Sequence, residues 1–390
     1  MMDIVPTERQ MNANQAIENI VKWFEAHDID SSLTTSRNYL VATVQLFNSK
    51  NEFLASGAGK GPWAIIGAYY EAFEHLLLEH QFISTNTSIR SLRYWLGSED
   101  HHEDCLFGKP LKEYEDGLLK FSRYYSLLNA RTYLLPEVLI NPFYKEPLIN
   151  NDAFQFLKPY SVNSGWASGS TFEEAILHGA NEVIECHHMS ELYKQCIGHK
   201  TSSGSEGFYK IKLPSALLVH PLSIPNLDQV SVVMSKTILG SYFCTCVLLS
   251  DLSPMALRSS GVSYSEYHAI ERALFELEET IELFTTKRRD CEIQAANLLS
   301  CTPKLSRLIK LSSLDELPYK DLTSLSPTSH YKFSAHYRNL IQALDDNNWT
   351  LLFHTAFQTT NIWLVSVFIP GLERFNVIDK GHWVVPLGNK

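Results

Sequence analysis

Three stretches of the sequence with helical periodicity each carry two glutamates three residues apart. Residues at this spacing lie on one face of a helix, roughly 5–6 Å apart at their Cβ atoms, so the two carboxylates of a pair repel each other. A divalent cation with oxygen ligands offsets that repulsion, and Mg²⁺ in proteins typically combines carboxylates with nucleotide phosphates. The pairs are Glu71 and Glu74, Glu182 and Glu185, and Glu276 and Glu279.

The surroundings of the first two pairs favour an inward orientation over the more common solvated face. Residues 64–78 are apolar on nearly every side, and residues 175–184 are apolar opposite the glutamates. Helices of this kind are buried on most faces, and a buried carboxylate must be paired or bound to a cation. The sequence therefore predicts a cavity that is lined by glutamates from separate helices and that holds a metal ion. Glu174, eight residues before Glu182, falls on the same helical face.

Other motifs give weaker indications. Gly59-Lys60-Gly61 precedes a helix, where free backbone N–H groups can bind an anion, but it lacks the spacing and the Ser or Thr of a Walker A loop. Two clusters of histidine and cysteine, at 101–105 and 186–188, lack the second half that a zinc site needs. Only its location favours Cys186 as a nucleophile.

Composition excludes several classes of function. The formal charge of −10 argues against nonspecific binding to nucleic acid or to an anionic membrane. The N-terminus has no basic segment followed by an apolar run, and no apolar stretch is long enough to span a bilayer. Seven cysteines at irregular spacing indicate free thiols in a reducing compartment. These features predict a cytoplasmic protein without nucleic-acid or membrane partners.

The elements that must position the glutamates are long helices and short strands. Several strands adjoin through short turns, which favours an α/β fold of the α+β kind, with mixed, mainly antiparallel sheets, over a doubly wound parallel sheet. The segment 88–156 is aromatic and irregular, and 299–329 is predicted to be a surface excursion. Expected helices are 14–26 (capped by Asn14), 62–80, 172–188 (capped by Ser170 or Thr171), 265–284 and 337–344, and expected strands are 39–47, 53–57, 230–235, 241–249, 349–357 and 362–369.

Three blocks together resemble the YcaO superfamily. They are GKG followed by a helix with A-x-x-E-x-x-E (Gly59–Glu74), S-G-x-A-x-G-x-T-x-E-E-A-I-L-H-G-x-x-E-x-I-E (Ser164–Glu185), and R-A-L-x-E (Arg272–Glu276). The resemblance implies one YcaO-like domain over 1–390, with a helix-and-strand lead-in at 1–48. It also implies an enzyme that depends on ATP and Mg²⁺ and activates a peptide backbone amide. The typical activity of the family is cyclodehydration of Cys, Ser or Thr to a thiazoline or an oxazoline in a ribosomally made, modified peptide such as a bacteriocin.

Site residues follow from the same resemblance. The metal ligands would be Glu71, Glu74, Glu182 and Glu185, and Arg272 would contact phosphate, although a helical salt bridge from Arg272 to Glu276 is the alternative. No individual catalytic residue is assigned. The predicted nucleotide-site residues are Lys60, Glu71, Glu74, Ser170, Glu174, Glu182, Glu185, Arg272 and Glu276.

The sequence departs from the family pattern at several positions. The family usually has Ser at Gly67, Arg at His75, Asn at Ser170, Arg at Cys186 and Gln at Glu279, and the tail from Pro386 to Lys390 lacks the proline-rich character of many azoline-forming members. These departures motivate a second hypothesis, in which the chain is a degenerate scaffold or binding subunit. A third hypothesis keeps ATP and forms a thioamide or an amidine.

The length of the chain suggests its partners. Family members fused to a leader-binding, ubiquitin-activating-like (E1-like, ThiF-like) domain are much longer than 390 residues. The resemblance therefore implies a separate leader-binding partner of that kind, which delivers the precursor peptide. A flavin dehydrogenase that oxidises azolines to azoles, and a homodimer within a larger complex, are further expectations.

Overall fold

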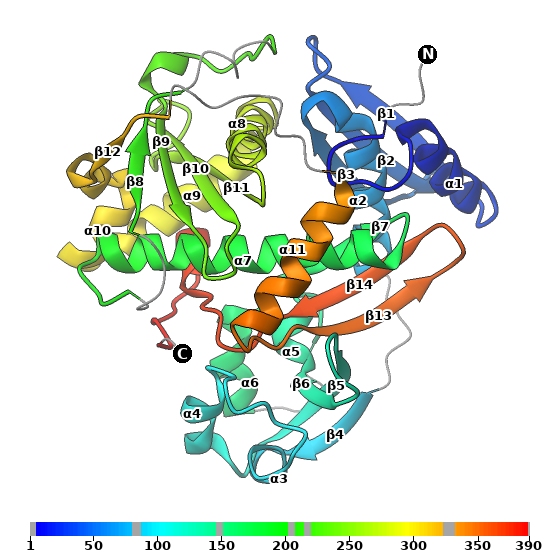
Figure 1. Cartoon of the computed structure of the whole chain (residues 1–390), viewed down its shortest axis with the longest axis vertical. Helices are drawn as coiled ribbons and strands as arrows, with labels where there is room; N and C mark the ends of the chain where they lie inside the picture. The colour runs from blue at the N-terminus through cyan, green and yellow to red at the C-terminus, as the bar shows by residue number, and fades with distance from the viewer. Residues whose placement is uncertain are drawn as a thin grey trace.

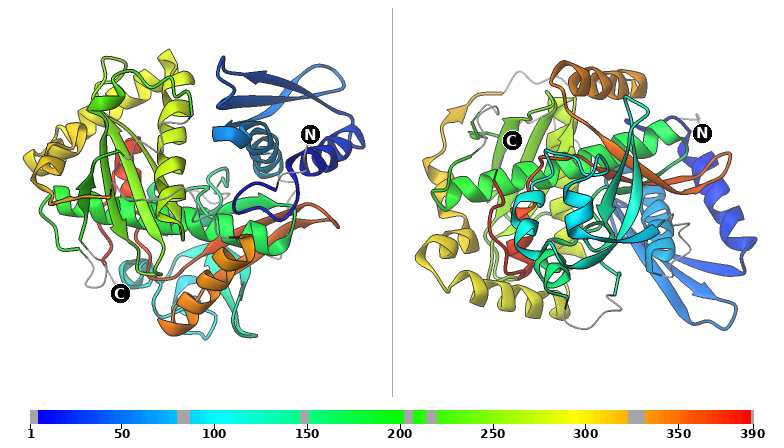
Figure 2. Two further views of the ribbon diagram at one scale, coloured as in Figure 1. Left: turned by 45° about the horizontal axis from the view of Figure 1, so that its top comes forward. Right: turned by 90° about the horizontal axis from the view of Figure 1, so that it is seen from below.

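The computed structural model describes residues 5–79, 87–145, 151–201, 207–213, 220–322 and 332–388. Three β-sheets are arranged around one 25-residue helix, α7 (Phe172–Cys196), which crosses the molecule from side to side (Figure 1). The hydrophobic core forms three clusters, two of which combine residues from two sheets. Figure 2 shows two of the sheets side by side on one face of α7, with the third on the opposite face.

The N-terminal layer contains a three-stranded antiparallel sheet in the order β1-β2-β3. Its strands are β1 (Ile29–Thr35), β2 (Val41–Asn48) and β3 (Phe53–Lys60), and its helices are α1 (Ala13–Glu25) and α2 (Ala64–Glu79), which follows the short 3-10 helix η1 (Gly61–Trp63). The cap of α1 is Asn12, whose side chain accepts from the N–H of Gln15, rather than the expected Asn14.

Glycines let β3 approach α2 closely. A Cβ atom on Gly57 would lie 2.1 Å from the backbone nitrogen of Ala72, and one on Gly59 would lie 1.9 Å from the carbonyl oxygen of Ala64. Gly67 faces Gly59 from the helix side. The glycines before the helix therefore serve strand-to-helix packing, which sets the position of α2 and its glutamates.

The second sheet has the order β11-β10-β9-β8-β12. All its pairings are antiparallel except the short parallel contact of β12 with β8. Helix α8 (Glu266–Glu282), capped by Ser265, packs on β11 and β10, and α9 (Thr286–Leu299) and α10 (Pro303–Lys310) follow it. The strands are β8 (Tyr209–Ile211), β9 (Ser231–Lys236), β10 (Tyr242–Leu248), β11 (Leu257–Ser263) and β12 (Tyr319–Lys320), with the 3-10 helices η5 (Leu227–Gln229) and η6 (Ser312–Glu316) between them.

The third sheet has the order β4-β5-β13-β14-β7, with β6 paired to β5. Helix α7 packs on β14 and β7, and α11 (Phe333–Asp346) packs on α7. The strands are β4 (Thr87–Ser91), β5 (Leu118–Ser126), β6 (Thr132–Pro136), β7 (Trp166–Gly169), β13 (Leu352–Gln358) and β14 (Trp363–Phe368). The short helices of this region are α3 (Leu92–Leu96), α4 (Gly108–Leu111), η2 (Lys112–Tyr114), α5 (Glu137–Ile140), α6 (Asp152–Leu157), η3 (Lys158–Tyr160) and, after β14, η7 (Phe375–Lys380).

The fold class predicted from the sequence is confirmed: the fold is mixed α/β, its sheets are mainly antiparallel and its helices are long. Sequence reasoning missed the strands and short helices of the aromatic middle segment. Within 299–329, Leu308, Leu311 and Leu314 are buried against the core, and the part after Leu322 lies outside the described residues. No helix in the described part of the chain is long and apolar enough to cross a membrane.

Gly57→Ala tests the contact between β3 and α2. Because the added Cβ would meet the backbone of Ala72, we expect a loss of about 1–3 kcal/mol in the free energy of unfolding, measured by chemical denaturation. Gly207→Ala is the matched control, since a Cβ atom there has no neighbour within 4 Å. Equal stability of the two variants would contradict this account of the glycines.

Candidate active site

Two adjoining cavities lie between α2, α7 and α8. The first chamber has a volume of about 660 Å³ and the second about 630 Å³. They share a wall, because five residues line both chambers. The shared residues are Lys60, Glu71, Asn163, Glu182 and Arg272.

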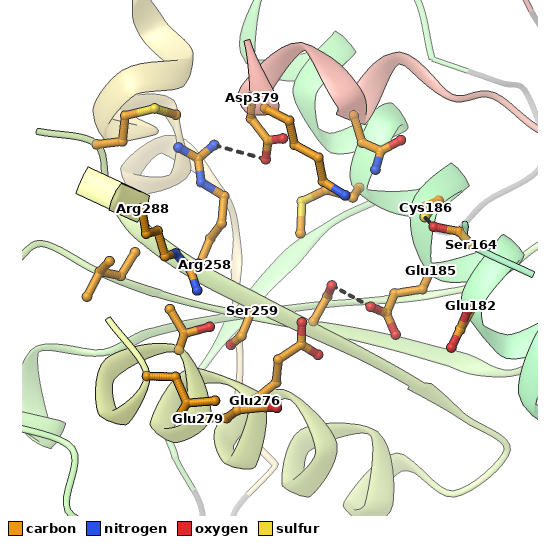
Figure 3. A pocket seen from close by; sticks show the side chains of 18 of the residues that line it. Ser164, Glu182, Glu185, Cys186, Arg258, Ser259, Glu276, Glu279, Arg288 and Asp379 are labelled. Carbon is orange, nitrogen blue, oxygen red and sulfur yellow. Dashed lines mark hydrogen bonds and ion pairs between the residues drawn. The ribbon is translucent and has the colours of Figure 1, made fainter. Parts of the chain in front are cut away.

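Helix α7 supplies one pair of glutamates to this space. The Oε2 atom of Glu182 accepts a hydrogen bond from the backbone N–H of Gly165 at 3.1 Å, and Glu185, one turn later, accepts from the hydroxyl of Ser260 at 2.8 Å. Cys186 follows and donates to Ser164 across 3.1 Å. In Figure 3, Glu182 and Glu185 extend from α7 toward the space that Glu276 and Glu279 approach from α8.

Helix α2 supplies the second pair. The Oε1 atom of Glu74 accepts from both the backbone N–H and the hydroxyl of Ser168, at 2.7 and 2.6 Å. Glu71 lies 3.9 Å from Nε2 of His75, whose other ring nitrogen lies 2.7 Å from the carbonyl oxygen of Ser56. Glu71 lines both chambers and Glu74 lines the second.

Helix α8 supplies the third pair, which faces a lysine. Nζ of Lys60, at the end of β3, lies 3.0 Å from Glu276 and 3.7 Å from Glu279. Burial alone would lower the pKa of Lys60, but Glu276, Glu279 and Glu185 outweigh it and raise that pKa. Lys60 therefore stays charged and links β3 to α8 across the first chamber.

The carboxylates of this region hold their protons unusually tightly. Burial, together with the charges of the neighbouring Glu74 and Glu185, raises the pKa of Glu182 to about 8. Burial is also the largest cause at Glu74, Glu185 and Glu279, whose pKa values are each raised to about 7. The pKa of Glu71 is raised for the same reason. The protein's own cations do not balance this charge, so an added cation would be stabilised here.

The donor set fits Mg²⁺ bound together with a phosphate. Among the described residues, no three His, Cys, Asp or Glu side chains lie close enough to hold an ion by themselves. Mg²⁺ usually takes one or two carboxylates and completes its shell with water and substrate phosphates. The glutamates of the shared wall are of that type, and Lys60 and Arg272 beside them are suited to phosphate oxygens.

The structure brings most of the predicted site residues to the chambers, with two exceptions. Ser170 is buried and shares a hydrogen bond of 2.8 Å with the hydroxyl of Tyr70. Glu174 pairs with Arg9 at 2.6 Å and accepts from the N–H of Gln10. Neither lines a chamber. The seven that do are Lys60, Glu71, Glu74, Glu182, Glu185, Arg272 and Glu276.

Sequence reasoning missed several contributors. Arg272 pairs with Glu8, at 3.2 Å, and not with Glu276 one turn along its own helix. Ser260 belongs to β11, which no expected strand covered, and Lys380 of η7 lines the first chamber. No local pattern marks Glu8, Ser260 or Lys380, because their roles arise from contacts between distant segments.

The sequence profile of one family matches residues 58–373 and is described as YcaO cyclodehydratase, ATP- and Mg²⁺-binding. The chain belongs to the YcaO family. This confirms the resemblance found from the three motif blocks, together with the two ligands that the family description names. No curated protein matches the sequence.

Several solved structures share the fold at low sequence identity. A YcaO protein from Methanopyrus kandleri, bound with AMPPCP and Mg²⁺, matches with a TM-score of 0.63 and 14% identity, over 97% of each chain. A heterocyclase in complex with substrate and cofactor matches with a TM-score of 0.62 and 16% identity, over 94% of this chain but only 54% of its own. The E. coli microcin synthetase McbBCD complex with pro-MccB17 bound matches with a TM-score of 0.52 and 16% identity, over 89% of this chain and 88% of that one. This chain thus spans about half the length of the heterocyclase.

The raised pKa values predict how stability depends on pH. Above pH 6.5, the ordinary pKa of histidine, the buried histidines with lowered pKa values are neutral in both the folded and the unfolded state. Between pH 6.5 and about 8 the glutamates with raised pKa values therefore let the folded state bind more protons than the unfolded state, and the free energy of unfolding should fall as pH rises through that window. Thermal melting at pH 6.5 to 8.5 measures this. Mg²⁺ with a non-hydrolysable ATP analogue should suppress the decline, because binding favours the ionised carboxylates. A melting temperature that rises toward pH 8 without ligand would contradict the charge imbalance.

Proposed function

We propose that this chain uses ATP and Mg²⁺ to activate a backbone amide of a peptide, and that the outcome is cyclodehydration of Cys, Ser or Thr to an azoline. The observation that carries the proposal is the carboxylate wall shared by two chambers, in a member of the YcaO family. A wall of carboxylates between two chambers suits a reaction between a nucleotide in one chamber and a second, larger substrate in the other.

The second chamber suits the nucleotide. Its flat aromatic side chains can stack on a purine base. Lys60 and Arg272, at the shared wall, would hold the phosphates, and Glu71, Glu74, Glu182 and Glu185 would hold the metal ion. The aromatic residues are Trp63, Tyr70, Trp166, Tyr267 and Phe275.

The first chamber suits the peptide. Serine, methionine and leucine side chains line it together with a larger number of charged ones, and it continues past the glutamates to Arg258 and Asp379 (Figure 3). Asp379 belongs to η7, near the C-terminal end of the described chain. A peptide in this chamber would present its carbonyl oxygen to the shared wall from the side opposite the nucleotide.

When bound there, ATP would supply the phosphoryl group that turns the amide oxygen into a leaving group, and Mg²⁺ would offset the charge on the phosphates. The chain's own residues would orient and shield this chemistry. Lys60 and Arg272 would hold the phosphates, the Gly165 and Ser168 backbone N–H groups fix two glutamates, and burial of the wall excludes bulk water.

The substrate and partners belong to the same proposal. The similar E. coli complex is a multi-protein microcin synthetase, and one of its structures has the pro-peptide pro-MccB17 bound. We infer for this chain a ribosomally made precursor peptide and a separate leader-binding, E1-like partner. A flavin dehydrogenase and a homodimer within the assembly remain part of the proposal, as does a cytoplasmic location.

Two other outcomes stay open to test. His75 and Cys186 stand where the family usually has arginine, and this favours a scaffold that binds peptide without turnover. Formation of a thioamide or an amidine would use the same activated amide with a different nucleophile. Intact mass of the modified peptide separates these outcomes, because each azoline ring loses one water, a thioamide exchanges oxygen for sulfur, and a scaffold leaves the mass unchanged.

Glu185→Gln tests the carboxylate wall. It removes one charge without changing size, so we expect peptide- and partner-dependent ATP hydrolysis to fall at least a hundredfold, as for loss of one group that stabilises transition-state charge. Release of phosphate measures the rate. Glu173→Gln, on the same helix but outside both chambers, is the matched control. Full activity of Glu185→Gln would overturn the site assignment.

A further inference from the structure

The segment before α1, residues 5–12, is here called the N-terminal strap, and it reaches all three glutamate-bearing helices. Two adjacent side chains make these contacts. Glu8 pairs with Arg272 of α8, while Arg9 pairs with Glu174 at the start of α7 and lies with its guanidinium carbon 5.1 Å from the ring centre of Tyr70 on α2. Both residues also line the second chamber. One dipeptide therefore fixes the mutual position of α2, α7 and α8.

Glu8 is enclosed by polar partners although only 1% of its surface is exposed. Its carboxylate accepts from the hydroxyl of Ser263 at 2.7 Å and faces Arg272 at 3.2 Å and His336 at 3.3 Å. His268 approaches it at 3.8 Å. Arg272 is the partner in this group that is charged at every pH, so it provides the permanent counter-charge.

Arg272 has competing partners on its other side. Its charge is stabilised by Glu8 and also by Glu185, Glu276 and Glu182, yet no ion pair within hydrogen-bonding distance joins it to those three in the described part of the chain. Its Nε atom is buried without a hydrogen-bond partner. Released from Glu8, the guanidinium would pair with Glu182 or Glu185, here called the wall glutamates, because a buried charge must find a partner.

We propose that Glu8 is a positioning residue, which holds Arg272 away from the wall glutamates and so keeps their carboxylates free to bind the divalent cation. The inference rests on the proposed function, since it assumes that these carboxylates hold the metal. It assigns a role to the N-terminal strap, which lies outside the residues matched by the family profile.

A double-mutant cycle on metal binding tests the role of Glu8. The probe is Mn²⁺ with a saturating concentration of a non-hydrolysable ATP analogue, added to the full-length chain, and the enhancement of water-proton relaxation by protein-bound Mn²⁺ reports binding. Glu8→Gln should weaken Mn²⁺ binding at least fivefold, the lower end of usual coupling between sites. The same substitution made in an Arg272→Gln background should change the affinity little, since the competing cation is then absent.

Two further variants separate positioning from folding. Glu8→Asp keeps the charge and tolerates the positive φ of 62° at this position, so it should recover most of the affinity. Glu18→Gln, on α1 and paired with the exposed Lys22, is the matched control and should bind like the unmodified chain. Thermal melting of every variant shows whether it is folded.

Each outcome of the cycle is decisive. Equal Mn²⁺ affinity for Glu8→Gln and the unmodified chain would overturn the inference, as would the same loss in both backgrounds, which indicates a purely structural role. No Mn²⁺ binding by the unmodified chain would overturn both the inference and the metal site of the proposed function. Normal metal binding with no ATP-dependent modification of a peptide would overturn only the proposed function.

Discussion

Mutual repulsion among buried carboxylates is the constraint around which this molecule is organised. Glutamates from α2, α7 and α8 line the two chambers on either side of the shared wall, and burial is the largest cause that raises the pKa values of Glu74, Glu182, Glu185 and Glu279. The features that reduce the cost are spread over the whole fold. They include Lys60 at the end of β3, backbone N–H groups of the segment containing β7, and the Ser260 hydroxyl of β11. Each sheet thus contributes to the same wall.

Helix α7 sets the geometry of this arrangement. Glu182 and Glu185 lie near its middle, and Ser190 and Tyr193, one and two turns further on, hold the segment η7. The Ser190 hydroxyl accepts from the N–H of Asn376, and the Tyr193 hydroxyl donates to Asp379 at 2.6 Å. One helix therefore fixes both the glutamates and the C-terminal segment that borders the first chamber. The distance between the glutamates and this segment is set by the rise of the helix.

Much of the wall was predictable from the sequence because helices carry their own periodicity. The spacing of three residues indicates that two glutamates share a helix face, and apolar surroundings indicate that this face is buried. The structure places the glutamates of α2, α7 and α8 at one pair of chambers. The expected strands of the second and third sheets were also found, with ends shifted by a few residues. Residues 87–145 gave no such signal, because short strands broken by prolines lack a repeating pattern.

Long-range partners were beyond the reach of sequence reasoning. The interaction of Arg272 with Glu8 joins residues 264 positions apart, and no local motif distinguishes Glu8 from any other glutamate near an N-terminus. The alternative pairing of Arg272 with Glu276 was reasonable for an isolated helix, but Lys60 pairs with Glu276 in the folded chain. Tertiary contacts decide such pairings, because a buried charge takes whichever partner the fold brings nearest.

The shared wall has a thermodynamic consequence for two ligands that occupy opposite sides of it. A ligand that ionises and orders Glu71 and Glu182 in one chamber does so for the other chamber as well. The second ligand then binds to carboxylates that are already ionised and ordered. Linkage is reciprocal, and each ligand must then strengthen the binding of the other by the same factor. In an enzyme built this way, cooperation between nucleotide and peptide arises from common side chains and needs no domain movement.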